Sequence, residues 1–213
     1  MGSVTGPAEP PTIEDVIADL AARPLATRTR AADALRELSR IDHRVYEAIA
    51  STTSPALDRP LRRLSSAANR SALWIAIAAG LTIVGGRRGR RAAVAGLTSV
   101  AFSSALVNIG LKSVYERARP DRAGTGVDEA RHVAMPSSSS FPSGHSASGF
   151  AFATAVGRDL PLLAFPLRIL AALVAYSRVH TGVHYPGDAV AGSLVGGATG
   201  LVVGGALDRR ARS

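Results

Sequence analysis

The sequence contains no cysteine, and this absence excludes several kinds of chemistry at once. Neither disulfide bonds nor thiolate nucleophiles are available, and the compartment of the protein cannot be inferred from cysteines. Lysine is almost missing as well, because Lys112 is the only lysine among 25 basic residues. A bias toward GC-rich codons explains the arginines. The lone lysine is either chance or marks a place where a compact ammonium group is needed.

The N-terminal residues also lack a basic segment followed by an apolar one, the pattern of a cleavable signal peptide. We expect residues 1–30 to be a partly disordered lead. Basic residues exceed the 16 acidic ones and give a net charge of +9. Such a charge fits nucleic acid, acidic lipid, an anionic substrate or the positive-inside bias of a membrane protein. Because the arginines cluster between apolar runs, we favour the membrane protein and expect no nucleic-acid partner.

Amphipathic helices are predicted in the polar N-terminal third. Residues 12–22 have a capping box and end before Pro24, and residues 31–50 carry apolar side chains at three- and four-residue spacing. A third, weaker stripe includes Leu57, Leu61 and Leu64. Ordinary packing explains such stripes, but the apolar sequence that follows favours helices that lie in a membrane interface over 31–70.

Five apolar runs follow, over residues 71–86, 92–111, 146–157, 162–179 and 189–207. About twenty apolar residues are needed to cross roughly 30 Å of hydrocarbon. We therefore predict an all-α fold, a polytopic transmembrane helical bundle of five or six membrane helices over residues 71–213, with the amphipathic N-terminal helices in front of it.

Glycines recur every four residues in the last run and form one face of a helix. Small residues at this spacing let helices approach closely in lipid. We favour packing inside the protomer over a homo-oligomer through this face. The face consists of Gly192, Gly196, Gly200 and Gly204.

The basic clusters predict the orientation in the membrane. Residues 87–91, Arg158 with Arg168, and residues 209–212 fall on one side if the chain crosses with each run. By the positive-inside rule this side is cytoplasmic, so the opposite ends face the outside of a bacterial plasma membrane. Five spans would leave the N-terminus outside. Either this long segment escapes the rule or a sixth element lies within 31–68.

Polar residues stand at the outer ends of the runs in three groups. Taken singly, each has an ordinary explanation: the cations as membrane anchors, Ser143 as a helix N-cap, and His184 with Asp188 as residues that cap a helix. Asp188 lies four residues after His184, hence on one helical face, and could hold the tautomer of its imidazole. We expect Arg117 and Arg122 to be solvated, and His132 and His180 to be structural or surface residues.

Together the three groups resemble the signature of the phosphatidic acid phosphatase type 2 superfamily. The matching segments are Lys112-x6-Arg119-Pro120, Pro142-Ser143-Gly144-His145 and Ser177-Arg178-x5-His184-x3-Asp188. Every signature residue is present, and the lone lysine is the first of them. The match covers about a third of the chain, and residues 1–40 have no counterpart in it.

The resemblance implies a role for each residue. His184 would attack phosphorus and form a phosphohistidine, Asp188 would orient His184, and His145 would protonate the leaving oxygen and then activate water. No metal or other cofactor is implied, because cations stabilise the charge of the transferred group; the motifs contain only Glu116 and Asp188 as acids. The groups that would bind the phosphate oxygens are Lys112, Arg119, Ser143, the Gly144 amide and Arg178.

The resemblance therefore implies an integral membrane phosphatase. Its substrate would be the phosphomonoester or diphosphate of a lipid, such as phosphatidate, phosphatidylglycerol phosphate or a polyprenyl diphosphate, with polyprenyl-phosphosugar phosphates as an alternative. A vanadate-dependent haloperoxidase of the same superfamily fits poorly with a small chain rich in apolar runs. A scaffold or transporter with a degenerate site fits poorly with the intact His145, His184 and Asp188.

Overall fold

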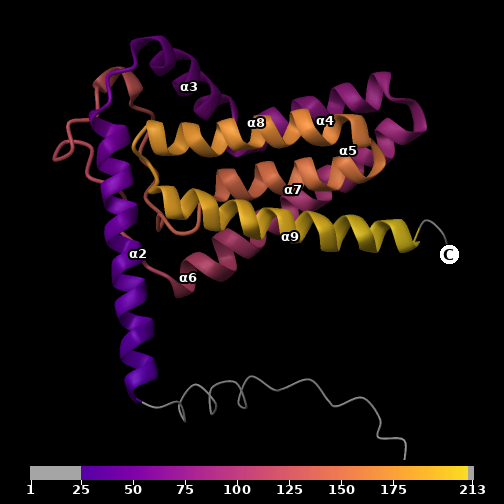
Figure 1. Ribbon diagram of the computed structural model, residues 1–213. Helices are drawn as coiled ribbons and strands as arrows, with labels where there is room; N and C mark the ends of the chain where they lie inside the picture. Colours follow the sequence, from indigo (N-terminus) through magenta and orange to yellow (C-terminus); the bar gives the residue numbers. More distant parts are fainter. Residues whose placement is uncertain (1–24, 211–213) are drawn as a thin grey trace, which may run out of the picture. The chain divides into compact units, whose positions relative to one another are not determined.

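In the computed structural model, residues 25–210 can be described, and their regular elements are all helical (Figure 1). The predicted helix over 12–22 lies outside the described residues. The chain divides into two compact units, residues 1–41 and 42–213. The helices are α2 (Leu25–Ser51), α3 (Pro55–Ala67), α4 (Ala72–Val84), α5 (Gly86–Ala105), α6 (Lys112–Val114), α7 (Gly144–Asp159), α8 (Pro161–His180) and α9 (Pro186–Arg210), with the short turns η1 (Asn69–Ser71), η2 (Leu106–Leu111, a π-helical turn) and η3 (Glu129–Arg131).

The first unit is described only for the N-terminal part of α2. Arg36 pairs with Asp33 at 2.6 Å and Arg40 pairs with Glu37 at 3.1 Å, all on the exposed surface. Exposed pairs at this spacing contribute little to stability. The prediction of a helix over 31–50 is confirmed, although α2 begins earlier, at Leu25.

Helix α7 is the centre of the second unit, where it packs against α5, α8 and α9 (Figure 1). Its side chains from Ser146 to Val156 are buried, apart from the half-buried Phe150. Most of these side chains are small, so the surrounding helices come close to its backbone. Farther along, Phe152 stacks at 5.4 Å on Trp74 of α4, and both rings are fully buried.

The glycine face of α9 makes the closest of these approaches. A Cβ atom added to Gly196 would lie 2.1 Å from the carbonyl oxygen of Ala147, and one added to Gly192 would lie 2.3 Å from that of Ser143. The predicted packing inside the protomer is confirmed. Helix α7 covers this face within the chain. The same contact holds the N-terminal ends of α7 and α9 together, where the site lies.

Within the described residues, three helical segments are long and apolar enough to cross a membrane: Gly86–Val114, α8 and α9. A fourth span is possible if α3 and α4, which meet at a bend of 64°, are taken together. The predicted number of five or six is not confirmed. The reason is length, because the 13 residues of α4 and the 16 of α7 extend only about 20 and 24 Å. Helix α7 is surrounded by other helices, so it need not match the hydrocarbon.

The arginines at 87–91 were expected to separate two runs, but they belong to the first turns of α5. Helix α4 instead ends at Val84 with Gly85 as its C-cap, and the close approach of Gly89 to Leu81 forms a tight α4–α5 hairpin. Three helices are tied together at this end of the bundle. Arg91 pairs with Asp159 at 3.0 Å and also with Asp208, and Asp208 accepts from Arg158 at 2.7 Å.

Candidate active site

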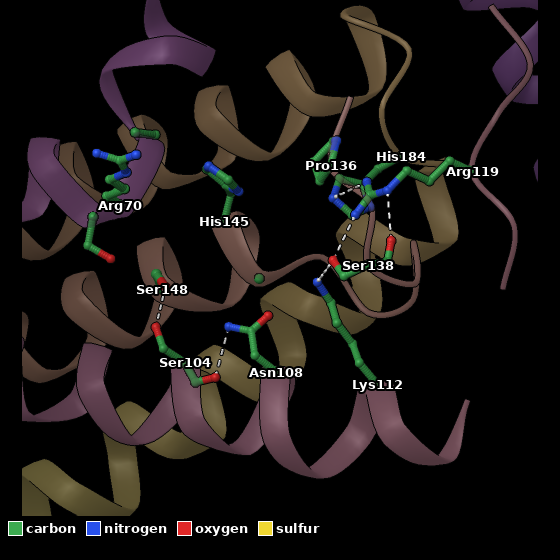
Figure 2. A pocket seen from close by; sticks show the side chains of 13 residues that line it. Arg70, Ser104, Asn108, Lys112, Arg119, Pro136, Ser138, His145, Ser148 and His184 are labelled. Atoms are coloured by element: carbon green, nitrogen blue, oxygen red, sulfur yellow. Dashed lines mark hydrogen bonds between the residues drawn. The ribbon is translucent and has the colours of Figure 1, made fainter. Parts of the chain in front are cut away.

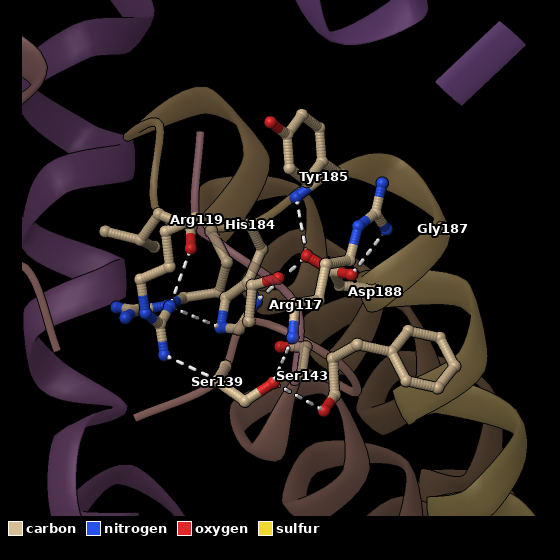
Figure 3. A network of polar contacts seen from close by, with 12 residues as sticks. Arg117, Arg119, Ser139, Ser143, His184, Tyr185, Gly187 and Asp188 are labelled. Atoms are coloured by element: carbon tan, nitrogen blue, oxygen red, sulfur yellow. Dashed lines mark hydrogen bonds and ion pairs between the residues drawn. The ribbon is translucent and has the colours of Figure 1, made fainter. Parts of the chain in front are cut away.

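His184 and Asp188 form a buried pair where the chain enters α9. Nδ1 of His184 lies 3.5 Å from Oδ2 of Asp188, a long distance for a hydrogen bond, and Nδ1 has no closer partner among the described residues. His184 precedes the first residue of α9 by two positions, so the expected common helical face is replaced by a turn at the helix start. The other ring nitrogen, Nε2, lies 3.4 Å from Nη1 of Arg119. The imidazole is therefore held between an anion and a cation (Figure 3).

Asp188 is fully buried and held by two donors. The backbone amide of Tyr185 donates to Oδ2 at 2.9 Å, and Nη1 of Arg117 donates to Oδ1 at 2.8 Å. Nη2 of the same guanidinium donates to Asp42 at 2.7 Å, and the group lies 4.2 Å from the centre of the Tyr185 ring. The prediction that Arg117 is solvated is wrong. It is part of the network that fixes Asp188.

The charge state of the pair follows from its surroundings. Burial lowers the pKa of the His184 imidazole, Asp188 opposes this, and Arg119 and Arg178 lower it further, so that the pKa is about 4. His184 is therefore neutral at pH 7, with one nitrogen free to act as a nucleophile. Burial also lowers the pKa of Arg117, but Asp188 and Asp42 outweigh it and raise the pKa above its ordinary value.

Lys112 and Arg119 are brought together by the serine-rich loop that precedes α7. Nζ of Lys112 donates to Oγ of Ser138 at 3.2 Å, and Nε of Arg119 donates to the Ser138 carbonyl at 3.0 Å. Arg119 also donates to the carbonyl of Val183 at 2.6 Å, next to His184. Lys112 and Arg119, which are seven residues apart, thus lie close together because both donate hydrogen bonds to Ser138.

Arg178 is buried at the end of α8. Its Nη1 donates to Oγ of Ser65 on α3 at 2.6 Å, whereas its Nε has no partner among the residues that can be described. The carbonyl of Arg178 accepts from the amide of His184 at 3.2 Å. A buried cation with an unused donor is costly unless an anion meets it, so this group is suited to a phosphate oxygen.

Ser143 is the N-cap of α7, as predicted. Its Oγ accepts from the amide of Ser146 at 3.4 Å and from the Ser146 hydroxyl at 3.0 Å. Its own amide donates to the carbonyl of Asp188 at 2.9 Å, so the starts of α7 and α9 are joined. The amide of Gly144 belongs to the first turn of α7, where unpaired amides attract anions.

A cavity of about 250 Å³ lies among these groups, and several of them line it (Figure 2). His145 lies on its wall, and Nε2 of its ring is 3.0 Å from Oδ1 of Asn69. Ser143, Arg178 and Asp188 do not line the cavity themselves but contact residues that lie next to it. Predicted site residues on the wall are Lys112, Arg119, Gly144, His145 and His184.

A family model matches more than half of the chain. Residues 92–211, from α5 through α9, match the model of the PAP2 superfamily. The chain belongs to the PAP2 superfamily. It is a membrane lipid phosphatase of the PAP2 type, and the resemblance found in the signature residues is confirmed.

Two bacterial relatives of this PAP2 phosphatase have named activities. A decaprenylphosphoryl-5-phosphoribose phosphatase of Mycobacterium tuberculosis is 35% identical over 157 residues, which cover 70% of this chain and 83% of the relative. A lipid A 1-phosphatase of Rhizobium etli is 37% identical over 105 residues, which cover 47% of this chain and 44% of that protein. Both names describe removal of a phosphate from a lipid-linked molecule.

A solved structure has the same PAP2 fold. The transmembrane PAP2-type phosphatidylglycerolphosphate phosphatase of Bacillus subtilis superposes with a TM-score of 0.62 at 23% identity, covering 91% of this chain and 92% of the other. This likeness confirms an all-helical, integral membrane fold.

Several residues of the PAP2 site were not found from the sequence. Arg117 stands two residues before the signature residue Arg119 in the segment after α6. In an extended segment, side chains two residues apart lie on the same side, so this spacing was the signal that could have identified Arg117. Asn69 and Ser65 carried no signal in the sequence, because they contact His145 and Arg178 only through the fold.

His180 is structural, as expected, and is buried with Nε2 2.9 Å from Asp58. Arg122 is half-buried rather than solvated and donates to the carbonyl of Val133 at 2.9 Å.

Proposed function

We propose that the chain hydrolyses a lipid-linked phosphate in two steps at His184. The lone pair of Nε2 attacks phosphorus, an N–P bond forms and the P–O bond to the lipid breaks. His145, which takes up a proton from the phosphate monoanion as the substrate binds, gives that proton to the leaving oxygen. In the second step water attacks phosphorus, His145 takes its proton and the N–P bond breaks. Inorganic phosphate leaves and His184 is regenerated.

The observation that supports this mechanism is the position of the His184 ring. Nδ1 faces Asp188 and Nε2 faces Arg119 at the wall of a cavity that His145 also lines. A ring oriented in this way has its nucleophilic nitrogen on the cavity side. Asp188 stabilises the positive charge that develops on the ring during attack.

The phosphate would be held by cations and a helix start. Lys112 and Arg119 approach from the loop side, Arg178 offers its unpaired Nε, and the amide of Gly144 begins α7. Charge spreads over the equatorial oxygens during transfer, so donors fixed before the reaction stabilise the transition state. Ser143 keeps the start of α7 in place through its bonds to Ser146 and Asp188.

We assign the substrate to polyprenyl-phosphosugar phosphates first, and to other lipid phosphates second. The decaprenylphosphoryl-5-phosphoribose phosphatase, whose match covers 70% of this chain, carries this type of substrate in its name. The lipid tail would lie outside the cavity, along exposed apolar side chains of α5 and η2. Phe102, Leu106 and Ile109 are exposed close to the cavity residues Ser104 and Asn108.

We also place this reaction on the extracytoplasmic face. His145 begins α7 and Arg158 ends it, and Arg158 joins the cluster with Arg91 and Asp208. The basic end is thus the opposite end of the bundle from the cavity, and the positive-inside rule assigns it to the cytoplasm. Labelling of a cysteine introduced at Gly126 tests this. The reagent should reach it from outside, and labelling from the cytoplasm alone would reverse the orientation.

A panel of substrates tests the function. The full-length protein in detergent should release phosphate from a polyprenyl-phosphosugar phosphate in the presence of EDTA, and phosphatidate and undecaprenyl diphosphate should be slower. His184→Gln should abolish release from all of them, with His132→Gln as the matched control. Unchanged release by His184→Gln, or complete loss with EDTA, would contradict the mechanism.

A further inference from the structure

The turn between α3 and α4 has an unusual backbone at the edge of the cavity. Arg70 has φ 52° and the next residue, Ser71, has φ 60°. Two consecutive residues with side chains in the left-handed region are uncommon, and such backbone persists where the surrounding structure holds it. The turn coincides with the bend of 64° between the two helices. It therefore fixes where its three side chains point.

All three side chains lie at the reaction centre. Asn69 holds the ring of His145 through Oδ1 at 3.0 Å, and Arg70 and Ser71 line the cavity. Figure 2 shows Arg70 on one side of His145, and Lys112, Arg119 and His184 on the other. Arg70 is exposed, and its guanidinium donates no hydrogen bond to any residue between 30 and 210 whose contacts are described. It is a cation on the cavity wall with its donors unused.

The direction of phosphoryl transfer decides what this cation meets. In the proposed mechanism the bond to the leaving group points away from His184 and toward His145. The part of the substrate beyond His145 is therefore the leaving group. Three polar side chains on the wall, those of Ser104, Asn108 and Ser148, lie between Arg70 and Lys112 (Figure 2). Such a wall suits a hydrophilic leaving group with a negative charge, and an acyl or prenyl chain would leave these polar groups unpaired.

We propose that Arg70 binds a second phosphate, one that stays on the leaving group. The enzyme then prefers substrates whose leaving group retains a phosphate, such as a lipid phosphodiester of a sugar, to phosphatidate, whose leaving group is a neutral diacylglycerol. This inference rests on the proposed function, because it needs the His184–His145 axis. It adds a specificity-determining residue outside the signature motifs. Arginine suits the task because its planar group binds two phosphate oxygens at once.

The test compares two substrates in the full-length unaltered protein and its variants. The probes are a polyprenyl-phosphosugar phosphate and phosphatidate, in the same detergent. Arg70→Ala should raise KM for the phosphosugar substrate by roughly tenfold or more, the effect of one lost charge-assisted hydrogen bond, and change kcat/KM for phosphatidate less than about twofold. Arg70→Lys should lie between. Arg63→Ala removes the same charge from an exposed position on α3 and should change neither substrate.

Each other outcome overturns a distinct statement. If Arg70→Ala lowers kcat/KM equally for both substrates, Arg70 is structural and the second-phosphate site is wrong. If it changes neither while His184→Gln abolishes both reactions, the site is wrong and the proposed function stands. If His184→Gln leaves both reactions intact, the proposed function itself fails. Arg70→Gln, which keeps the length and polarity of the side chain, provides the same comparison where Arg70→Ala does not fold.

Discussion

Nη1 of Arg117 lies 2.8 Å from Oδ1 of Asp188, and this pair connects the loop after α6 to the start of α9. The same guanidinium holds Asp42 at 2.7 Å. Arg117 does not line the cavity of about 250 Å³ that holds His145 and His184, so we expect it to act through the Asp188–His184 pair. The relationship explains how an aspartate with 0% exposure remains charged beside a neutral histidine.

Replacing Arg117 tests its role as a positioning residue. Arg117→Ala should lower kcat by roughly tenfold to a hundredfold, the effect of losing a hydrogen bond to a charged group, with little change in KM. Arg117→Lys should recover part of the loss, because it keeps the charge but cannot bridge both carboxylates. Steady-state kinetics provide the measurement, and the exposed neighbour Glu116→Gln is the control. A rise in KM alone would show that Arg117 contacts substrate.

The titration of His184 should occur far below that of an ordinary histidine. Its pKa is about 4 in the fold, against about 6.5 in the unfolded chain. NMR of ring-labelled histidines in detergent, assigned with His184→Gln, should show no protonation of His184 between pH 7 and pH 5. A midpoint near 6.5 would contradict the burial.

The same shift predicts the sign of a pH effect on stability. Between pH 6.5 and pH 4 the unfolded chain binds a proton at this position and the folded chain does not, so acid favours unfolding. The stability contributed by neutral His184 is present above about pH 6.5 and is lost as the pH falls toward 4. Thermal unfolding should therefore depend less on pH over this window in His184→Gln. An equal slope in both proteins would contradict the assignment.

Ser65 should set the affinity for phosphate, although it lies on α3, outside the signature. It accepts from Nη1 of the buried Arg178 at 2.6 Å. Ser65→Ala leaves this guanidinium free to turn, so the inhibition constants of inorganic phosphate and orthovanadate should rise by roughly tenfold. Ser66→Ala, at the exposed neighbouring position, is the control. Equal constants in both variants would show that α3 does not position Arg178.

The glycine face of α9 should be intolerant of any side chain. Gly196→Ala would place a Cβ 2.1 Å from the Ala147 carbonyl, so the helices must separate, at a cost of about 1–3 kcal/mol. Gly197 has open space around it, and Gly197→Ala should be neutral. Thermal unfolding in detergent compares the two. Because the face also joins the starts of α7 and α9, Gly192→Ala should lower activity too.

The local patterns of this sequence were sufficient to predict most of its helices. Each of the five apolar runs lies largely within helical structure, and Ser143 is an N-cap, because periodicity and capping are properties of neighbouring residues. The predicted number of spans is not confirmed, because only three or four of the described helical segments are long and apolar enough to cross a membrane. A short apolar run such as 146–157 reads the same whether lipid or protein surrounds it, and α7 is surrounded by protein.

The signature was sufficient to predict that Lys112, Arg119, His145 and His184 lie together, and all four line one cavity. It did not predict the residues that hold these side chains in place. Arg117 finds its partners 71 and 75 residues away, and Ser65 lies 113 residues before Arg178. No spacing rule predicts such pairs, because they depend on how α3, α8 and α9 pack. The position of Arg70 could not be predicted from the sequence either, because it depends on the backbone of the turn between α3 and α4.

The phosphohistidine intermediate tests the central claim most directly. The protein should be mixed with radiolabelled p-nitrophenyl phosphate, whose leaving group needs no proton, and then quenched with base. In His145→Asn the label should accumulate on His184, because attack proceeds while hydrolysis lacks its base. His184→Asn should carry no label. Label on His180 or on any other residue, or phosphate release by His184→Asn at the rate of the unaltered protein, would contradict the account.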